Sequence, residues 1–150
     1  MANPTPRFAA VGDLARSRED IVRPFRVRHG AKALVASSDR VLLVQERHAD
    51  GTPFWTLPGG AAYRNESLTD ALRREISEEL RCRCTVGKPL DSFWYVHRSR
   101  DRTASVYTVF GCALGSRPSP VPAEGVKATR WVDPAVPPSR TLPAVRTLLD

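Results

Sequence analysis

Short apolar runs separated by polar turn residues fill the chain from about residue 27 onward. Residues 27–36 and 41–45 are two such runs, and the polar residues between them form a turn, so the pair predicts a β-hairpin. Aromatic and β-branched runs at 91–98 and 103–114 predict a second hairpin in the same way. Further short strands are expected at 54–57 and 128–132.

One segment repeats its apolar residues with helical spacing instead. The repeat forms a stripe about 120° wide that must face a core, and its members are Leu68, Leu72, Ile76 and Leu80. Ser67, followed three residues later by Asp70, is a capping-box pattern that starts the helix here. A second helix is expected at 141–149, after the break at Pro137 and Pro138. Strands and helices in this order predict a mixed α/β layered domain.

The two ends of the sequence differ in composition. Residues 1–24 are polar and Arg-rich, which predicts an N-terminal extension that is partly ordered on the domain. Residues 25–150 have the length of a single domain with its own core. No apolar run approaches the ~20 residues that cross a bilayer, and the first 25 residues contain no apolar signal region. We therefore expect a cytoplasmic protein with no membrane partner.

The net charge indicates only a broad class of ligand, and the cysteine content indicates only the redox state of the thiols. The net charge of +7 favours anionic ligands such as nucleotides or nucleic acid. The arginines are dispersed along the chain, however, so charge alone indicates no particular class of anion. The cysteines Cys82, Cys84 and Cys112 are odd in number and fit reduced thiols better than a disulfide framework.

Three carboxylates lie on one arc of the predicted helix. Glu75, Glu78 and Glu79 fall beside the apolar stripe, and like charges at these spacings repel one another. Arg74 can pair with Glu78 at i+4 and offsets part of this charge. A magnesium-type ion offsets the rest, because it prefers oxygen ligands and shared phosphate oxygens. Such a helix seen alone is typical of a solvated acidic face; its spacing from the Gly59–Gly60 turn is what favours a metal site.

This segment resembles the signature of the Nudix hydrolase family: Gly, five residues, Glu, seven residues, then Arg-Glu-apolar-x-Glu-Glu-x-Gly-apolar. Residues 55–60 also resemble the usual lead-in to that signature. The one departure is Arg81, which stands where the family has a late glycine that commonly ends the helix. The matching residues are Gly60, Glu66, Arg74, Glu75, Ile76, Glu78, Glu79 and Cys82. The resemblance implies an α/β/α sandwich with a mixed β-sheet, the motif loop and helix, and a C-terminal helix.

The resemblance also implies residue roles and a cofactor. Glu78 and Glu79 would hold Mg²⁺, with Mn²⁺ as a substitute, and Glu75 would be a further ligand or the base that activates water. Arg74 would orient the glutamates, so that the catalytic set is Glu75, Glu78 and Arg74. The implied metal set is Glu75, Glu78 and Glu79, with Glu66 as a secondary ligand or helix-start support, the backbone of Gly60 close by, and Glu124 from the loop ahead of the last strand.

Candidate substrate-binding residues flank the motif and the second hairpin. Tyr63 and Arg64 lie in the loop beside the expected metal site. Tyr95 can stack on a base, although aromatic residues in strands more often belong to a core. His97 and Arg98 lie near the hairpin turn and can contact phosphate, although a solvated hairpin tip has the same composition.

The function that the resemblance implies is metal-dependent hydrolysis of a pyrophosphate bond in a nucleoside diphosphate linked to another moiety. Small nucleotides, ADP-sugars, dinucleotides and nucleoside triphosphates are the substrates to expect. One alternative is a pyrophosphohydrolase acting on the 5′ end of RNA. The other is a Nudix-like regulator that senses a nucleotide without turning it over, and a homodimer is suggested only at the level of the family.

Overall fold

The computed structural model describes residues 6–7, 26–97 and 102–150. The described elements in chain order are β1 (Pro6–Arg7), β2 (Arg26–Ser37), β3 (Arg40–Arg47), β4 (Pro53–Thr56), β5 (Gly59–Ala61), α2 (Leu68–Leu80), β6 (Cys84–Val96), β7 (Thr103–Leu114), the 3₁₀ turn η2 (Pro122–Glu124), β8 (Ala128–Val132) and α3 (Pro143–Leu149). Most of the expected extension, residues 1–24, and the candidate Arg98 lie outside the described residues. The backbone of Pro6 and Arg7 pairs in parallel with β6.

Both expected hairpins are present. The turn between β2 and β3 uses Ser38 and Asp39 at positive φ, 48° and 63°, which matches the right-handed twist of the flanking strands. β2 and β3 pair only beside this turn and then separate. β2 continues along β7 in parallel and along β5 in antiparallel pairing, whereas β3 pairs with β4 and β8. The sheet is therefore mixed, as predicted, with the order β1-β6-β7-β2-β3-β4.

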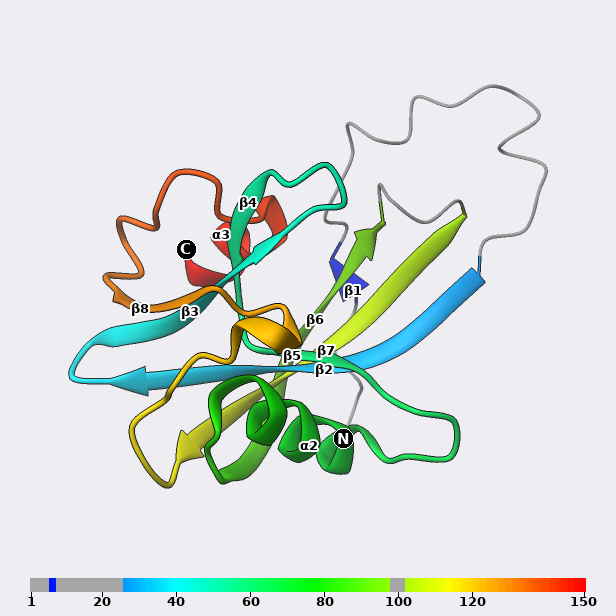
Figure 1. Cartoon of the computed structure of the whole chain (residues 1–150), viewed down its shortest axis with the longest axis horizontal. Helices are drawn as coiled ribbons and strands as arrows, with labels where there is room; N and C mark the ends of the chain where they lie inside the picture. Colours follow the sequence, from blue (N-terminus) through cyan, green and yellow to red (C-terminus); the bar gives the residue numbers. More distant parts are fainter. Residues whose placement is uncertain (1–5, 8–25, 98–101) are drawn as a thin grey trace.

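The two helices cover opposite faces of the sheet (Figure 1). Alternate residues of β2 and β3 serve the two sides, because successive strand residues point to opposite faces. The core on the α2 side contains Ala31, Ala33, Leu42, Val44, Leu72, Ile76 and Leu80. The core on the α3 side contains Val41, Leu43, Phe93, Val109, Ala144 and Val145. The α/β/α sandwich and the buried helical stripe are thus confirmed.

Helix α2 has a capped start and an unusual end. At its start the hydroxyl of Ser67 accepts a hydrogen bond from the Asp70 N–H at 3.1 Å. At its end Arg81 adopts the left-handed conformation, with φ 54° and ψ 36°, and its N–H reaches Ser77 O at 3.0 Å. Ser119 and Val121 of the following Pro-rich loop donate their N–H groups to Leu80 O and Glu79 O, both at 2.9 Å. The loop therefore satisfies carbonyls that a helix end leaves unpaired.

The structure differs most from the sequence expectation at three elements, whereas the other boundaries shift by at most two residues. Residues 59–61 form strand β5 rather than only a turn, because they pair with β2. β6 begins at Cys84 rather than at residue 91, and register shifts near Pro89 hid its first half from a pattern of alternation. α3 begins at Pro143 rather than at residue 141, because Leu142 N–H bonds to Trp55 O and keeps the preceding backbone extended. No helix of the described residues has both the length and the apolarity needed to cross a membrane.

Candidate active site

Arg74 joins the motif loop to the motif helix. Its Nε and Nη2 donate to both oxygens of Glu66 at 2.9 Å, and Nη2 also reaches Ala61 O at 3.0 Å. Its Nη1 donates to Glu75 at 3.0 Å and to Glu78 at 3.3 Å, so the expected i+4 pair is present. The fork of donors in one planar guanidinium makes this possible. Glu66 also accepts the Tyr63 N–H at 2.9 Å, so it fixes the loop ahead of α2.

These contacts leave signs in the pKa of the paired groups. The hydrogen bond from Arg74, followed by that from the Tyr63 N–H, lowers the pKa of Glu66. The same pair with Glu66, together with Glu75, raises the pKa of Arg74 against the opposing effect of its burial. Glu66 and Arg74 therefore both stay charged at neutral pH, and the ion pairs of Arg74 with Glu66, Glu75 and Glu78 are maintained.

The Gly59–Gly60 turn packs directly on the carboxylates of α2. Gly59 N–H donates to Glu79 Oε2 at 3.2 Å. Its φ of 132° favours glycine, and a methyl group there would collide with Ala31 O. A methyl group on Gly60 would lie 2.7 Å from Cδ of Glu75. The two glycines are therefore required by the close approach of backbone and carboxylates.

Glu79 is the most buried of the motif acids, with 5% of its surface exposed. Burial raises its pKa well above the ordinary value, the Lys32 ammonium opposes that shift, and Glu46 and Glu75 add to it. A hydrogen bond between Glu79 and Glu75 contributes in the same direction. The pKa of Glu46 on β3 is also raised, by burial first, against the opposing effect of Lys32. Glu46, Glu75 and Glu79 therefore form one interacting set of acids around the glycine turn.

Lys32 lies beside this set of acids. Its Nζ donates to Gly59 O at 3.1 Å and lies 4.7 Å from the centre of the Tyr107 ring. Burial lowers the pKa of Lys32, but electrostatic interactions, with Glu46 first and then with Tyr107, Glu79 and Glu75, outweigh burial and raise it overall. The lysine is therefore charged in the folded protein.

A pocket of about 360 Å³ opens over these groups. Its acidic lining residues, within the described ranges, are Glu46, Glu75, Glu79 and Glu124. Its cationic lining residues are Arg28, Lys32 and Arg47, and its remaining lining includes Thr56, Gly59, Gly60, Tyr107 and Leu142. The structure thus brings the candidate Glu124 to the same pocket as Gly60, Glu75 and Glu79. Glu78 does not line this pocket; it is 38% exposed on its side chain and turned toward Arg74.

One side of the pocket is an aromatic wall, made of His48, Phe54, Tyr95 and His97. The rings of His48 and Phe54 stack at 4.1 Å, and those of Phe54 and Tyr95 lie 6.5 Å apart. The Tyr95 hydroxyl and His48 Nδ1 are 3.1 Å apart, and His97 Nε2 lies 2.6 Å from the Ser105 hydroxyl. Hydrogen bonds therefore fix the rings in place, including those of the two candidates Tyr95 and His97.

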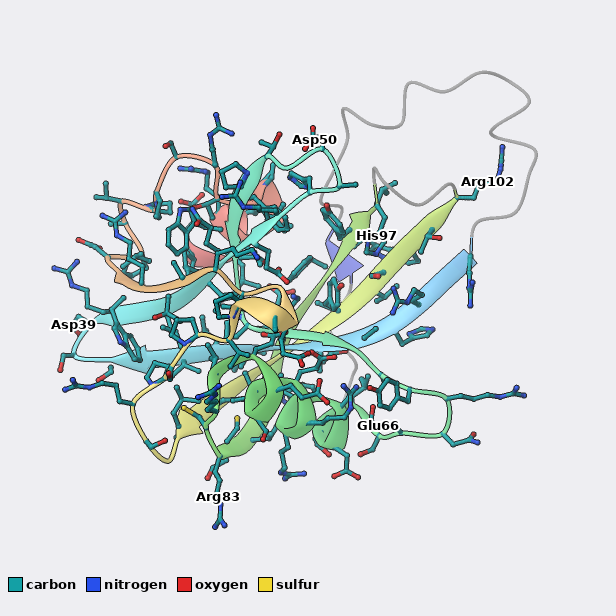
Figure 2. All side chains as sticks on the ribbon, in the orientation of Figure 1. Asp39, Asp50, Glu66, Arg83, His97 and Arg102 are labelled. Carbon is teal, nitrogen blue, oxygen red and sulfur yellow. The ribbon has the colours of Figure 1, made fainter. Side chains whose placement is uncertain are left out.

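The other candidate substrate residues lie in a separate hollow. A hollow of about 650 Å³, called the basic hollow below, is lined by Arg26, Val27, Arg28, His29, Ala62, Tyr63, Arg64, Glu66 and Leu68. The Arg74 guanidinium lies 3.7 Å over one face of the Tyr63 ring. Arg28 lines both the pocket and the basic hollow. In Figure 2, Glu66 lies ahead of α2 and His97 lies near the end of β6.

The residues at the glycine turn fit a hard divalent cation by their chemistry. Carboxylate oxygens are the ligands that Mg²⁺ prefers, and the Gly60 backbone lies against Glu75 with no side chain between them. Among the described residues, no three acid, histidine or cysteine side chains already form a closed ligand set. Arg74 Nη1 contacts both Glu75 and Glu78 and so holds these two carboxylates close together.

Sequence reasoning missed several lining residues. Lys32, Glu46 and Tyr107 belong to strands far from the motif, and His48 and Phe54 come from the loop after β3 and from β4. One signal was available for Lys32: it is a charged residue in the middle of an apolar run of small and branched residues. The others carried no local sign of their position, because only strand pairing brings them together.

Comparison with known proteins agrees with this architecture. The model of the family described as NUDIX domain matches residues 26–147. The MutT NUDIX hydrolase from Burkholderia pseudomallei is a similar solved structure, with 25% identity and a TM-score of 0.73 over 83% of this chain and 96% of that chain. A bifunctional NMN adenylyltransferase/ADP ribose pyrophosphatase from Francisella tularensis, complexed with AMP and a Mn ion, is 27% identical with a TM-score of 0.58. The match covers 85% of this chain and 40% of that protein.

A curated relative shows a shorter match. The low-salt glycan biosynthesis protein Agl8 of Haloferax volcanii is 40% identical over 47 residues, which are 31% of this chain and 30% of that protein. The chain thus matches less than a third of that relative's length. The family match spans most of the chain, so the chain belongs to the Nudix family.

Proposed function

We propose that this enzyme hydrolyses a pyrophosphate bond in a nucleoside diphosphate linked to another moiety, with Mg²⁺ or Mn²⁺ bound at the glycine turn. The observation that carries the proposal is the packing of Glu75 and Glu79 on Gly59 and Gly60 at the base of a pocket with an aromatic wall. One end of this pocket suits a charged phosphate chain and the other suits a flat ring. A nucleotide derivative has both.

Glu75, Glu78 and Glu79 are the residues that would hold the cation, beside the Gly60 backbone. Glu124 reaches the same pocket and would add a ligand, whereas Glu66 is engaged with Arg74 and supports the helix start. When bound, the cation would neutralise charge that develops on the phosphate oxygens. The Mn ion and AMP in the Francisella relative support a cation and a nucleotide as ligands of this fold.

The protein's own groups would orient the reaction. Arg74 holds Glu75 and Glu78 in a fixed relation at 3.0 and 3.3 Å. Glu75 lies against Gly60 and lines the pocket, and it would take a proton from an attacking water. The buried Thr56 hydroxyl lines the same pocket, and no group of the described residues bonds to it.

The aromatic wall is the proposed site for the base. Base–aromatic stacking contributes roughly 1–3 kcal/mol per base. Phe54 and Tyr95 are held roughly parallel, with 18° between their planes, and His48 supports Phe54 from one side. A purine or pyrimidine would stack on this wall without a large rearrangement.

The 5′ end of RNA is the second candidate substrate, and the basic hollow is the observation that favours it. Tyr63 is 62% exposed although the Arg74 guanidinium fixes one of its faces, so it is a preformed surface for stacking. Arg26, Arg28 and Arg64 surround it, and arginines beside an exposed ring are typical of single-strand binding. Because Arg28 also lines the pocket, a chain that leaves the pocket would pass directly into this hollow.

A hydrolysis screen tests the proposal. Purified protein with Mg²⁺ or Mn²⁺ at about pH 8.5 would be offered ADP-ribose, NADH, diadenosine polyphosphates, nucleoside triphosphates and 5′-triphosphate RNA, with Glu79→Gln as the inactive control. Turnover of a panel member, lost in Glu79→Gln, supports the enzyme and identifies its substrate class. Metal-dependent nucleotide binding with no turnover would instead support the sensing alternative.

A matched pair of variants separates the two substrate candidates. Arg64→Ala lowers turnover of RNA and leaves small nucleotides unaffected if the basic hollow binds the chain that follows the first nucleotide. Arg117→Ala removes an exposed arginine that lines neither site and controls for net charge. Equal effects of the two variants on RNA would argue against this use of the hollow. The cytoplasmic location and the homodimer stay predictions.

A further inference from the structure

The pocket is lined by a buried lysine, in a chain whose other basic residues are mostly arginines. The sequence has 20 arginines and three lysines. Lys88 and Lys127 are exposed, whereas Lys32, in the middle of β2, is 5% exposed. Lysine is almost never buried to this extent unless it is paired. The position therefore has a specific partner.

Lys32 and Glu79 hold opposite sides of the same glycine. Gly59 is the residue directly across from Lys32 in the β2–β5 pair. Lys32 Nζ donates to the carbonyl of Gly59 at 3.1 Å, and Gly59 N–H donates to Glu79 at 3.2 Å. These two hydrogen bonds add to the backbone pairing of β5 with β2 and to the Ala33 N–H bond to Pro58 O in holding the turn. The next residue of this turn, Gly60, lies against the Glu75 carboxylate.

Lys32 provides positive charge beside three acids, Glu46, Glu75 and Glu79. Glu46, Glu75 and Glu79 all act on Lys32 electrostatically. Arg74 pairs with Glu75 but forms no ion pair with Glu79 or Glu46 among the described residues. The Lys32 ammonium also lies over the Tyr107 ring, 4.7 Å from its centroid. Lys32 is thus placed as a permanent cation inside the cluster.

We propose that Lys32 is a positioning residue of the active site: its ammonium is the built-in counter-charge of the Glu46, Glu75 and Glu79 cluster and fixes Gly59. It keeps the carboxylates in place before a divalent cation arrives, and its like charge weakens the binding of that cation. This inference rests on the proposed metal site. It goes further by assigning a role to a residue outside the motif, with opposite effects on cation affinity and on turnover.

Three substitutions in the full chain separate charge from hydrogen bonding. Lys32→Met removes both the charge and the donor, Lys32→Gln keeps an N–H donor without the charge, and Lys32→Arg keeps the charge. Lys88→Met is the matched control, because it removes one positive charge at an exposed position of β6 that lines no part of the pocket. Mn²⁺ affinity is measured by calorimetry on the metal-free proteins, and thermal unfolding is followed in chelator.

The expected result is a split between affinity and turnover. Lys32→Met and Lys32→Gln bind Mn²⁺ about tenfold more tightly than wild type, because a like charge near the cation is gone. Lys32→Met also loses about tenfold in kcat on the substrate that the screen identifies, whereas Lys32→Gln loses less because it still bonds to Gly59 O. Lys32→Arg and Lys88→Met keep the wild-type Mn²⁺ affinity. In chelator, the Tm of Lys32→Met is lower than that of wild type. Adding Mn²⁺ raises the Tm of Lys32→Met by more than it raises the Tm of wild type.

Two negative results have different meanings. If wild type itself binds no Mn²⁺, the proposed metal dependence is wrong and the role of Lys32 is rejected with it. If wild type binds Mn²⁺ and the Met and Gln variants bind it with unchanged or weaker affinity, only the role of Lys32 is wrong, and the lysine merely fills space beside Tyr107. Should Lys32→Met not fold, the Gln variant decides the question by the same affinity comparison.

Discussion

Two residues of this protein, Arg81 and Glu79, occupy positions that lower its stability. Arg81 occupies a left-handed position at the end of α2 that a glycine would fill without strain. Glu79 places a carboxylate in a buried position where its charged form is disfavoured. The first cost affects only the helix end, and the second lies at the site itself. Substituting Arg81 should therefore change stability alone, whereas substituting Glu79 should change both stability and activity.

Replacing Arg81 by glycine should stabilise the fold. A residue other than glycine in the left-handed region is strained, so Arg81→Gly should raise the free energy of unfolding by about 0.5–1 kcal/mol. Arg81 forms no ion pair among the described residues, so kcat/KM should not change. Urea unfolding measures the effect, and Arg81→Ala, which keeps the strain, should show no gain. A glycine variant less stable than wild type would contradict this account.

Replacing Glu79 by glutamine should abolish activity and yet stabilise the metal-free protein at high pH. Burial raises the pKa of Glu79 above its ordinary value of 4.5, so the stability that neutral Glu79 provides is complete below pH 4.5. That stability is lost as the pH rises through the raised pKa. Glutamine cannot ionise, so at pH 8 Glu79→Gln should exceed wild type by about 1–3 kcal/mol. Thermal melts in chelator at pH 8 and pH 4.5 should show this gap close at the lower pH; a gap of constant size would count against it.

At the scale of elements, α2 acts as one unit with the loop that precedes it. The Ser67 cap fixes where the helix begins, and this fixes which face carries the acids. Arg74 then ties that face to Glu66 and to Ala61 O in the loop. The residues of the sequence motif therefore form one structural unit, in which Arg74 bonds to Glu66, Glu75, Glu78 and Ala61 O.

Exchanging Arg74 for lysine should disrupt this unit while keeping the charge. An ammonium cannot reach Glu66, Glu75, Glu78 and Ala61 O at once, as the guanidinium fork does. Arg74→Lys should lower kcat/KM by about 10–100-fold and the free energy of unfolding by about 1–3 kcal/mol. Arg73→Lys is the control, since the adjacent Arg73 is half-exposed and pairs with Asp70 at 3.2 Å. Similar losses in the two variants would show that Arg74 is not the special partner.

At the scale of the whole molecule, the pocket is assembled from most of the chain. Its lining residues range from Arg28 on β2 to Leu142 before α3. The Pro-rich loop ends α2 by bonding to Glu79 O and Leu80 O, and the same contact carries Glu124 to the pocket. A ligand at this site would therefore connect elements that are far apart in sequence.

Cation binding should accordingly stabilise the entire domain. At a Mn²⁺ concentration of one hundred times Kd, linkage adds about 2.7 kcal/mol to the free energy of unfolding. For a chain of this size that corresponds to a rise in Tm of roughly 5–10 °C. Melts followed by circular dichroism with increasing Mn²⁺ measure the rise, and Glu79→Gln should show little of it. A Tm that does not depend on Mn²⁺ in wild type would contradict a cation site that joins these elements.

The sequence by itself determined the features that depend on local spacing. Helical periodicity placed the stripe of Leu72 and Ile76 in the core, and the Ser67 signal placed the helix start within one residue. The same periodicity set Glu75 and Glu79 beside that stripe, and the Arg74–Glu78 pair follows from its i+4 spacing. These features hold because residues three and four apart on a helix are neighbours whatever the rest of the fold does.

Only the tertiary structure decided which distant residues complete the site. Strand pairing sets Lys32 opposite Gly59, and the docking of the loop onto the end of α2 sets Glu124 in the pocket. It also separated Tyr63 and Arg64, in the basic hollow, from Tyr95 and His97 in the aromatic wall. Register between strands and the path of a loop are fixed by contacts between residues far apart in the chain, and local pattern carries no record of them.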